Sequence, residues 1–274
     1  MRAKDGSVTM KKLFTFAVCA YRDSPYLEAA LESAVHQSIP VEIVVATSTP
    51  SPYIAGLAAK YHAGYRVNPR RGGGIAEDWR FALSCAKTRY AAIMHQDDIY
   101  FPDYASQVVR AAERFPDTGI VFTDYGDLLS DGKFRPGRGY LWVKRCLLWA
   151  FYLKHSHRSR FFKRSALIFG NAVCCPSVTY DLETLGQVEF DPSYGVNTDW
   201  AKWLELAEGN ARFVMVPKVL MAHRISGDME TASAIADSRR YREDLRIFGE
   251  IWGAGFARLL MLVYGLAYRN NRCD

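Results

Sequence analysis

The sequence lacks the cysteine patterns that stabilise small secreted domains or hold zinc. Its six cysteines form no C-x-x-C pair and have no zinc-type spacing with histidine, so neither a disulfide framework nor a structural zinc site is expected. The first dozen residues are charged, and no apolar core follows them as in a signal peptide. No stretch reaches the roughly 18 uncharged apolar residues of a membrane span. These absences predict a reducing, cytoplasmic location.

The glycine-rich nucleotide signatures are also missing. Neither a P-loop nor the G-x-G-x-x-G dinucleotide fingerprint occurs, and the chain has no internal repeat and no low-complexity tract. What is present is a chain of 274 residues with 49% hydrophobic content, which can bury a full core. Its net charge of +6 is modest for this size and predicts little beyond some preference for anionic partners.

Acidic residues are absent between Asp131 and Asp181. This stretch predicts one basic face and a mostly helical insertion at about residues 133–170, where a second substrate could be selected. A nucleic-acid partner is not expected, because no nucleic-acid-binding module accompanies the basic residues. The cations are Lys133, Arg135, Arg138, Lys144, Arg145, Lys154, Arg158, Arg160, Lys163 and Arg164, and the aromatic residues among them are Trp142, Trp149, Phe151 and Tyr152.

Short apolar runs alternate with helical patterns in the first half of the chain. The runs at residues 13–20, 41–46, 65–67 and 90–95 predict strands, and helices are expected between them. Such alternation is typical of an α/β fold with a mainly parallel sheet covered on both faces. Ligands bind such sheets at the carboxyl ends of the strands, so the loops after the first, second and fourth runs should converge.

The second half is less regular. Residues 173–180 predict a strand, a helix is expected to open at Thr198 and run to residue 208, and residues 212–216 predict a strand closed by Pro217. We expect one domain over residues 1–230 and an amphipathic helical tail over residues 231–274. The tail could pack on its own domain, on a second subunit in a homodimer, or on a membrane surface.

Two local patterns indicate chemistry. In His95-Gln96-Asp97-Asp98, two adjacent carboxylates follow an apolar run, where they repel each other unless a cation joins them. Mg²⁺ or Mn²⁺ takes one or two protein carboxylates together with substrate phosphates. Residues 68–79 (NPRRGGGIAEDW) place glycines at a helix start, where a phosphate or ribose can approach. A solvated acidic turn and a flexible glycine turn are the plainer explanations.

Four segments taken in order resemble the family 2 inverting glycosyltransferases with the GT-A fold: VCAYRDSPYLEAALESAVHQS, VEIVVATSTPS, NPRRGGGIAEDWRFAL and RYAAIMHQDDIYFPDY. The resemblance covers about residues 13–125. A weaker match, Asn197-Thr198-Asp199-Trp200, falls where these enzymes carry an acid at the start of a helix facing the acceptor. The resemblance implies a GT-A type, Rossmann-like sheet and sugar transfer from a nucleotide-sugar donor.

The resemblance also implies roles for single residues. Asp98 would bind Mn²⁺ or Mg²⁺, Asp97 would contact the ribose or the sugar near the diphosphate, and Asp199 would be the general base. A helix-start acid favoured by the dipole would equally explain Asp199. The other implied donor-binding residues are Ala20, Tyr21 and Asp23 after the first strand, Thr47 and Ser48 after the second, Gly74 and Asp78, Gln96 beside the metal, and His223 and Arg224 in a late loop that closes over the diphosphate.

Two departures from the family pattern bear on the donor. Many relatives carry an aspartate that reads uracil after the second strand, where this chain has Thr47 and its neighbours, and the metal motif begins with the uncharged Gln96. A UDP-linked donor is still the expectation. A sugar nucleotidyltransferase would carry a glycine-rich loop where this chain has residues 21–25, and a non-catalytic sugar-binding protein would not need Asp97, Asp98 and Asp199.

The acceptor is expected to be a saccharide or a polyprenyl-diphosphate-linked saccharide used in surface polysaccharide or glycan synthesis. The basic insertion and the apolar tail could lie together on the inner face of the plasma membrane, with cations near lipid phosphates and tryptophans in the interface. This would make the enzyme a peripheral membrane protein.

Overall fold

One mixed sheet of ten strands forms the centre of the protein in a computed structural model that describes residues 12–137, 139–225 and 238–270. The main path through the sheet is β3-β2-β1-β4-β9-β6-β10-β5, with β7 beside β6 and β8 beside β10. The strands are β1 (Phe14–Ala20), β2 (Glu42–Thr47), β3 (Gly64–Val67), β4 (Tyr90–His95), β5 (Ile99–Tyr100), β6 (Thr118–Leu129), β7 (Phe134–Arg135), β8 (Ser156–His157), β9 (Val178–Asp181) and β10 (Arg212–Ile225).

Most neighbouring strands along the main path of the sheet are parallel. Strand β1 pairs in parallel with β2 and β4, β2 with β3, and β6 with β10. Strand β9 lies between β4 and β6 and is antiparallel to both. The predicted α/β fold with a mainly parallel sheet is therefore confirmed, and β9 joins its two halves.

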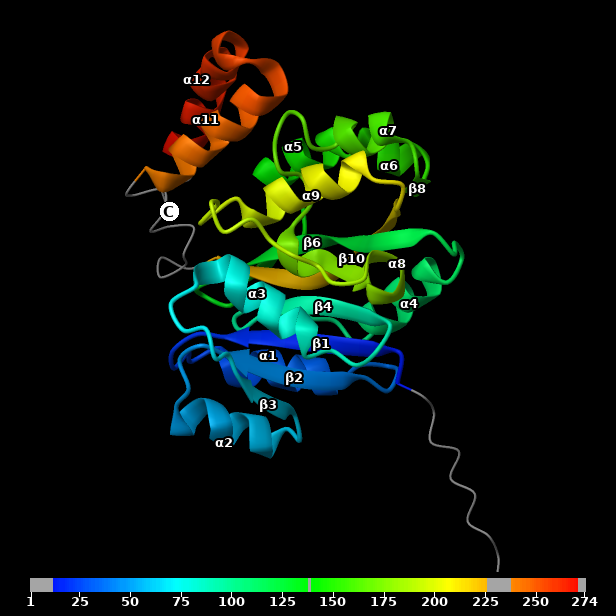
Figure 1. The fold of residues 1–274 in the computed structure, drawn as a ribbon, viewed down its shortest axis with the longest axis vertical. Coiled ribbons are helices and arrows are strands. Elements are labelled where there is room, and N and C mark those ends of the chain that lie inside the picture. Colours follow the sequence, from blue (N-terminus) through cyan, green and yellow to red (C-terminus); the bar gives the residue numbers. More distant parts are fainter. Residues whose placement is uncertain (1–11, 138, 226–237, 271–274) are drawn as a thin grey trace, which may run out of the picture.

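Helices cover both faces of the sheet (Figure 1). They are α1 (Leu27–Val35), α2 (Pro52–Lys60), α3 (Gly74–Ser84), α4 (Tyr104–Ala112), α5 (Tyr140–Leu147), α6 (Trp149–Leu153), α7 (Arg160–Ser165), α8 (Leu182–Leu185), α9 (Thr198–Glu208), α11 (Arg239–Trp252) and α12 (Ala254–Asn270), with a 3₁₀ turn at Cys175–Ser177. Alternate side chains of β4 point to opposite faces. Ala92 and Met94 pack in the cluster with α1, α2 and α4, whereas Ala91 and Ile93 pack in the cluster with α3 and α9.

Two predicted boundaries were wrong. Strand β10 does not close at Pro217 but continues to Ile225, because a register shift between Val216 and Val219 accommodates the proline without ending the pairing with β6. The strand expected at residues 173–180 is shorter, since a 3₁₀ turn precedes β9. Helix α9 begins at Thr198 and ends at Glu208, as expected, but the Thr198 hydroxyl donates to the carbonyl of Tyr194 instead of capping the helix.

The insertion is mostly helical, as predicted, but its charges do not form a free basic face. Many of its cations pair with acids from neighbouring elements: Arg145 with Asp124, Arg158 with Asp117, and both Arg160 and Arg164 with Glu208. The ammonium of Lys163 is enclosed by the carbonyls of Leu206, Gly209 and Ala211, near the end of α9. Several cations of this segment are therefore partly neutralised by acids that lie outside it.

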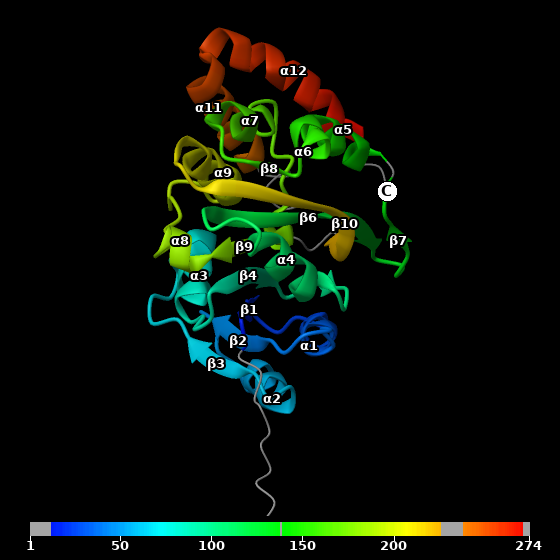
Figure 2. The ribbon, with the colours of Figure 1, turned by 90° about the vertical axis from the view of Figure 1, so that its right-hand side faces the viewer.

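The described tail, helices α11 and α12, packs on its own domain. Ile247 and Phe248 of α11 and Ala257 and Met261 of α12 are buried in the same cluster as α3 and α9. Figure 2 shows α11 and α12 at the end of the molecule that also carries α5, α6 and α7. The expected boundary at residues 230/231 lies outside the described residues. Among the residues that are described, none of the helices has the length and apolar character needed to cross a bilayer.

Candidate active site

The loops after β1, β2 and β4 converge at the carboxyl edge of the sheet, as the parallel pairing requires. The side-chain amide of Gln96 joins two of them, because its Oε1 accepts from the backbone N–H of Tyr21 at 2.9 Å and its Nε2 donates to the Tyr21 carbonyl at 3.0 Å. The backbone N–H of Arg22 donates to Thr49 Oγ1 at 2.6 Å, and this hydrogen bond joins the loop after β2 to the loop after β1. A carboxylate could accept but not donate here, so the glutamine at the first motif position has a structural reason.

A second polar cluster surrounds Asp78 of α3. Ser48, after β2, donates to Asp78 Oδ2 at 2.9 Å, and Asn68, after β3, donates to Asp78 Oδ1 at 2.9 Å. Thr47 Oγ1 accepts from the backbone of the same loop at 3.0 Å. Sequence reasoning did not single out Asn68, although it opens the glycine-rich segment. These side chains form the polar wall that the resemblance assigns to the nucleoside.

The remaining residues that were predicted to bind the donor lie near the same edge. Ala20 is buried and Tyr21 is half exposed, while Asp23 Oδ1 accepts from Ser51 Oγ at 2.5 Å, at the start of α2. Gly74 opens α3 with a φ of +73°, in the left-handed region where a side chain would be strained. The glycine is therefore required by the turn that leads into α3.

His95, Asp97 and Asp98 bring their ligand atoms within 4.8 Å of one another. Asp98 is fully buried, and its Oδ1 accepts from His223 Nδ1 and from the backbone N–H of Arg224, each at 2.9 Å. Its other oxygen, Oδ2, is buried without a hydrogen-bond partner among the described residues, and so is His95 Nε2. A divalent cation would satisfy such an unpaired carboxylate oxygen, so the residues present fit the predicted metal.

The charges of this cluster also suit a cation. Burial opposes ionisation of Asp98, but the neighbouring His223 imidazole outweighs it and lowers the pKa of the carboxyl. Burial, and then repulsion by Asp98, raises the pKa of Asp97. Asp98 is thus held ionised beside Asp97, which resists ionisation, and a bound cation would favour the ionised form of Asp97. Trp79 stacks on His95, with ring centroids 5.6 Å apart, and orients its ring.

His223 and Arg224 lie within β10, not in the late loop that the resemblance suggested. Strand pairing with β6 extends to Ile225 and includes both residues. Arg224 Nε donates to the Asp97 carbonyl at 2.9 Å, and its guanidinium lies 4.2 Å from the ring centre of Tyr26. Both residues therefore support the acidic motif directly from an ordered strand.

Asp199 lies in the first turn of α9 and is partly exposed. Its Oδ2 accepts from Asn171 Nδ2 and its Oδ1 from the backbone N–H of Trp200, each at 2.7 Å. Burial raises the pKa of the Asp199 carboxyl, against the attraction of Arg240 and Lys144. A carboxyl with a raised pKa is a stronger base than an ordinary aspartate once it is ionised.

Cys174 and Cys175 connect the metal cluster with Asp199. Burial raises the pKa of the Cys174 thiol, and Asp98 and Asp199 both raise it further, although Lys144 opposes them. The same two carboxylates act on Cys175. Both acids therefore act on the same buried pair of residues, shortly before β9.

Lys144 is a further cation at this edge that sequence reasoning did not single out. Its ammonium donates to Tyr125 Oη at 2.9 Å and lies 5.5 and 5.6 Å from the ring centres of Tyr125 and Tyr140. Tyr125 in turn packs edge-on against His223. Neither Lys144 nor Asn171 carries a local sequence signal, because each is brought to the site by the insertion.

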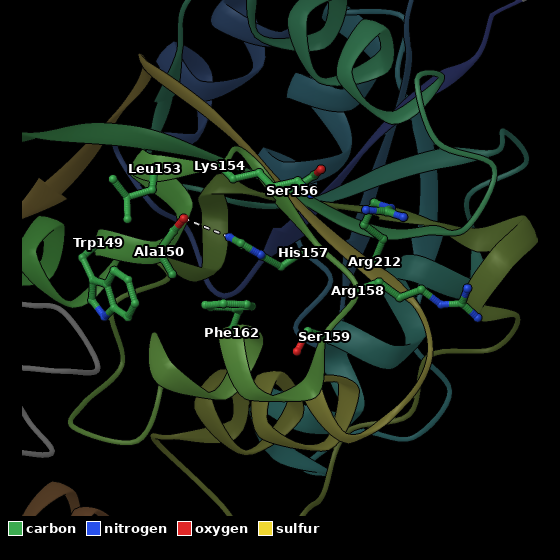
Figure 3. A pocket seen from close by; sticks show the side chains of 10 residues that line it. All are labelled: Trp149, Ala150, Leu153, Lys154, Ser156, His157, Arg158, Ser159, Phe162 and Arg212. Carbon is green, nitrogen blue, oxygen red and sulfur yellow. Dashed lines mark hydrogen bonds between the residues drawn. The ribbon is translucent and has the colours of Figure 1, made fainter.

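A hollow of about 470 Å³ lies elsewhere, between α6, α7, β8 and the start of β10 (Figure 3). Arg212 is the first residue of β10 and His223 is near its last, so roughly 35 Å of strand separates this hollow from the acidic motif. It is lined by Trp149, Ala150, Leu153, Lys154, Ser156, His157, Arg158, Ser159, Phe162 and Arg212. It contains none of the residues expected to bind the donor.

Comparison with known proteins agrees with this geometry. Residues 15–180, more than half of the chain, match the sequence model of glycosyl transferase family 2. The chain belongs to this family. No curated protein matches the sequence. The matched residues of this family 2 glycosyltransferase include the acidic motif and Asn171, and end before α9 and the histidine of β10.

Solved structures share the fold of this family 2 enzyme. The S. aureus TarS fragment 1–349 in complex with UDP-GlcNAc has a TM-score of 0.63 at 15% identity, over 90% of this chain and 73% of that one. The longer S. aureus TarS has a TM-score of 0.59 at 15% identity over 92% of this chain, which spans only 42% of TarS. Mannosyltransferase PcManGT from Pyrobaculum calidifontis, in complex with GDP-Man and Mn²⁺, has a TM-score of 0.57 at 17% identity, over 94% and 76%. These likenesses establish the GT-A glycosyltransferase fold.

Proposed function

We propose that the protein is a metal-dependent inverting glycosyltransferase that moves a sugar from a nucleotide-sugar donor to a saccharide or lipid-linked saccharide. The observation that carries this proposal is the acidic cluster of His95, Asp97 and Asp98, whose ligand atoms lie within 4.8 Å of one another at the carboxyl edge of the sheet. Asp98 is buried, and its Oδ2 lies 3.6 Å from His95 Nδ1 without a hydrogen-bond partner among the described residues, whereas Asp199 is partly exposed at a helix start. Asp98 is therefore suited to bind a cation, and Asp199 is suited to accept a proton.

The donor's diphosphate would bind at the acidic motif. A divalent cation held by Asp98, with Asp97 and His95 beside it, would neutralise the charge that grows on the departing diphosphate. The chain itself contributes fixed contacts: His223 and Arg224 keep Asp98 ionised and oriented. Lys144 adds a further positive charge at this edge, near Tyr125.

The acceptor's hydroxyl would lose its proton to Asp199. Asn171 and the Trp200 amide each hold one carboxylate oxygen, which fixes the plane of the carboxylate while leaving lone pairs for the acceptor. Attack from the face of the sugar opposite the diphosphate inverts the anomeric centre, so an α-linked donor would give a β-linked product. This deprotonation contributes roughly 10²–10⁴ to the rate.

A UDP-linked sugar is the donor we propose. The Ser48, Asn68 and Asp78 cluster supplies polar groups near the expected base and ribose. The structure of TarS in complex with UDP-GlcNAc supports this choice. The structure of PcManGT with GDP-Man and Mn²⁺ supports the use of a cation, and it makes a GDP-linked sugar the alternative donor to test.

The proposal is tested with wild-type protein and a panel of UDP- and GDP-sugars. We expect slow hydrolysis of one UDP-sugar, which depends on Mn²⁺ or Mg²⁺ and stops with a chelator. Calorimetry should give tighter binding of UDP than of GDP in Mn²⁺. Cleavage of GDP-sugars but not of UDP-sugars would show that the donor is GDP-linked. Metal-independent binding of every nucleotide would contradict the mechanism.

The acceptor we propose is a polyprenyl-diphosphate-linked saccharide, reached at a membrane surface during surface polysaccharide or glycan synthesis. Helix α12 buries one face in the domain yet leaves a second apolar stripe outside, at Phe256, Leu259 and Leu262, which are 43%, 55% and 70% exposed. Spacing of three residues places them on one helix face. Trp142 of α5, at the same end of the molecule, is 67% exposed. Such a stripe with aromatic residues suits a bilayer interface.

Vesicle flotation measures this contact. We expect the wild-type protein to float with vesicles containing phosphatidylglycerol, and the Leu259→Gln/Leu262→Gln variant to bind roughly 100-fold more weakly, since two leucines lose their apolar burial. Val35→Gln, at an exposed apolar position on α1, is the matched control and should float normally. A wild-type dimer that the double variant dissociates, without any flotation, would instead make this face a subunit interface.

A further inference from the structure

Helix α11 contacts the segment that leads into Asp199. The Glu243 carboxylate accepts three successive backbone N–H groups, those of Gly195 at 2.8 Å, Val196 at 3.0 Å and Asn197 at 2.8 Å. These amides stand at the start of α9, whose N-terminal residue makes no capping hydrogen bond of its own. An acid from a distant part of the chain therefore binds the N-cap amide of this helix and the two amides before it.

Two further contacts hold the same segment. Asn197 Nδ2 donates to Asp244 Oδ1 at 2.6 Å, and both residues are buried. The ring of Phe248 meets the ring of Trp200, the residue after Asp199, edge to face at 5.2 Å. Helix α11 thus holds the segment two to four residues before Asp199 through its two acids, and the side chain one residue after Asp199 through an aromatic ring.

The physical effect is to fix the backbone from which the Asp199 side chain extends. A nearby negative charge stabilises the free N–H groups at a helix start, and the positive end of the helix dipole in turn stabilises the Glu243 carboxylate. Without Glu243, three amides would need other partners, and the first turn of α9 could shift or fray. A displacement of about 1 Å at a reacting group can cost 10²-fold in rate.

We propose that Glu243 is a positioning residue for Asp199, so that the C-terminal helix α11 is a working part of the active site. This inference rests on the proposed role of Asp199 as general base. It assigns to α11 a task that the family-matched residues 15–180 do not perform. Asp244 and Phe248 assist by holding Asn197 and Trp200.

The test compares Glu243→Gln with Glu250→Gln. The first puts an amide N–H₂ where one oxygen accepted backbone N–H groups, so at least one capping bond is lost. The second makes the same change on the same helix at a residue that contacts Tyr194 Oη and Arg246 but no backbone amide of the segment. Hydrogen exchange followed by mass spectrometry reports the amides of residues 193–200, and steady-state kinetics use the nucleotide-sugar that the wild-type enzyme hydrolyses.

We expect Glu243→Gln to speed exchange across residues 193–200 and to lower kcat by about 10- to 100-fold, with the Kd for UDP in Mn²⁺ unchanged. Glu250→Gln should match the wild type in all three measurements. Should Glu243→Gln not fold, Asp244→Asn is expected to lower kcat in the same pattern by a smaller factor.

Faster exchange with unchanged kcat would overturn the inference, because α11 would then serve stability alone. Unchanged exchange would overturn it as well. A wild-type protein that hydrolyses no nucleotide-sugar would refute the proposed function, and with it the role toward Asp199, while the exchange data would still report whether Glu243 caps α9.

Discussion

Asp199→Asn is expected to abolish sugar transfer while the donor still binds. Asparagine keeps the shape of the side chain, and its one oxygen can still accept from the Trp200 amide while its N–H₂ faces Asn171, but it cannot take a proton from the acceptor. General base catalysis is worth roughly 10²–10⁴ in rate, so kcat should fall by that range. Calorimetry with UDP and Mn²⁺ should give the wild-type affinity, because Asp199 belongs to the acceptor side.

The pH dependence of kcat should report the same carboxyl. Burial raises the pKa of Asp199, and the base works only when ionised, so kcat should rise with pH along a limb whose midpoint lies above the usual aspartate value. The limb should be missing from the residual activity of Asp199→Asn. A limb at or below the ordinary pKa of aspartate would argue that another group takes the proton.

Stability provides the control for this variant. A carboxyl whose pKa is raised by folding stabilises the protein most when protonated, and this contribution is lost as pH rises through the folded pKa. At neutral pH, Asp199→Asn should therefore melt no lower than the wild type. Glu205→Gln, on the same helix, removes the ion pair with the buried Lys202 but should leave kcat unchanged.

Asp98→Ala is expected to remove metal-dependent donor binding. Loss of a residue that merely supports a metal ligand costs 10–100-fold in affinity, so loss of the ligand itself should exceed about 100-fold. The variant also leaves His223 and the Arg224 amide without their shared acceptor. Titration of UDP with and without Mn²⁺ should give the same weak affinity in both, whereas the wild type gains from the cation.

Two companions separate metal loss from misfolding. Asp98→Asn keeps an acceptor for the Arg224 amide but lacks the charge, so it should fold normally and still lose the Mn²⁺ effect. Asp103→Asn, an exposed acid just before α4, should keep it. Undiminished Mn²⁺-dependent binding in Asp98→Asn would move the cation to Asp97 and His95, which are the other members of the cluster.

The donor half of the fold could be predicted because its signals are local. Strand β4 is an uninterrupted apolar run, and the acids that follow it need a cation or water, so both the strand and the motif were readable. Strands β1 to β3 share the same alternation with helices. The convergence of their loops then follows from parallel pairing, and the contacts of Gln96 and Asp78 confirm it.

What could not be predicted depends on contacts between distant residues. A proline such as Pro217 usually ends a strand, but a register shift lets β10 continue past it. Only the pairing with β6 reveals this continuation. The cations of the insertion looked free in the sequence because their acidic partners, such as Asp124 and Glu208, lie outside it. Glu243 looked like one charge on an amphipathic helix, although it caps another helix.

Strand β10 also has a consequence for how the protein is made. The ribosome delivers Asp97 and Asp98 early, but the imidazole and guanidinium that compensate them follow only after residue 222. Until then a nascent chain carries an acid pair that resists desolvation, even though it already contains the segment that defines the family. Its donor pocket is therefore expected to mature last, when the C-terminal third has left the ribosomal tunnel.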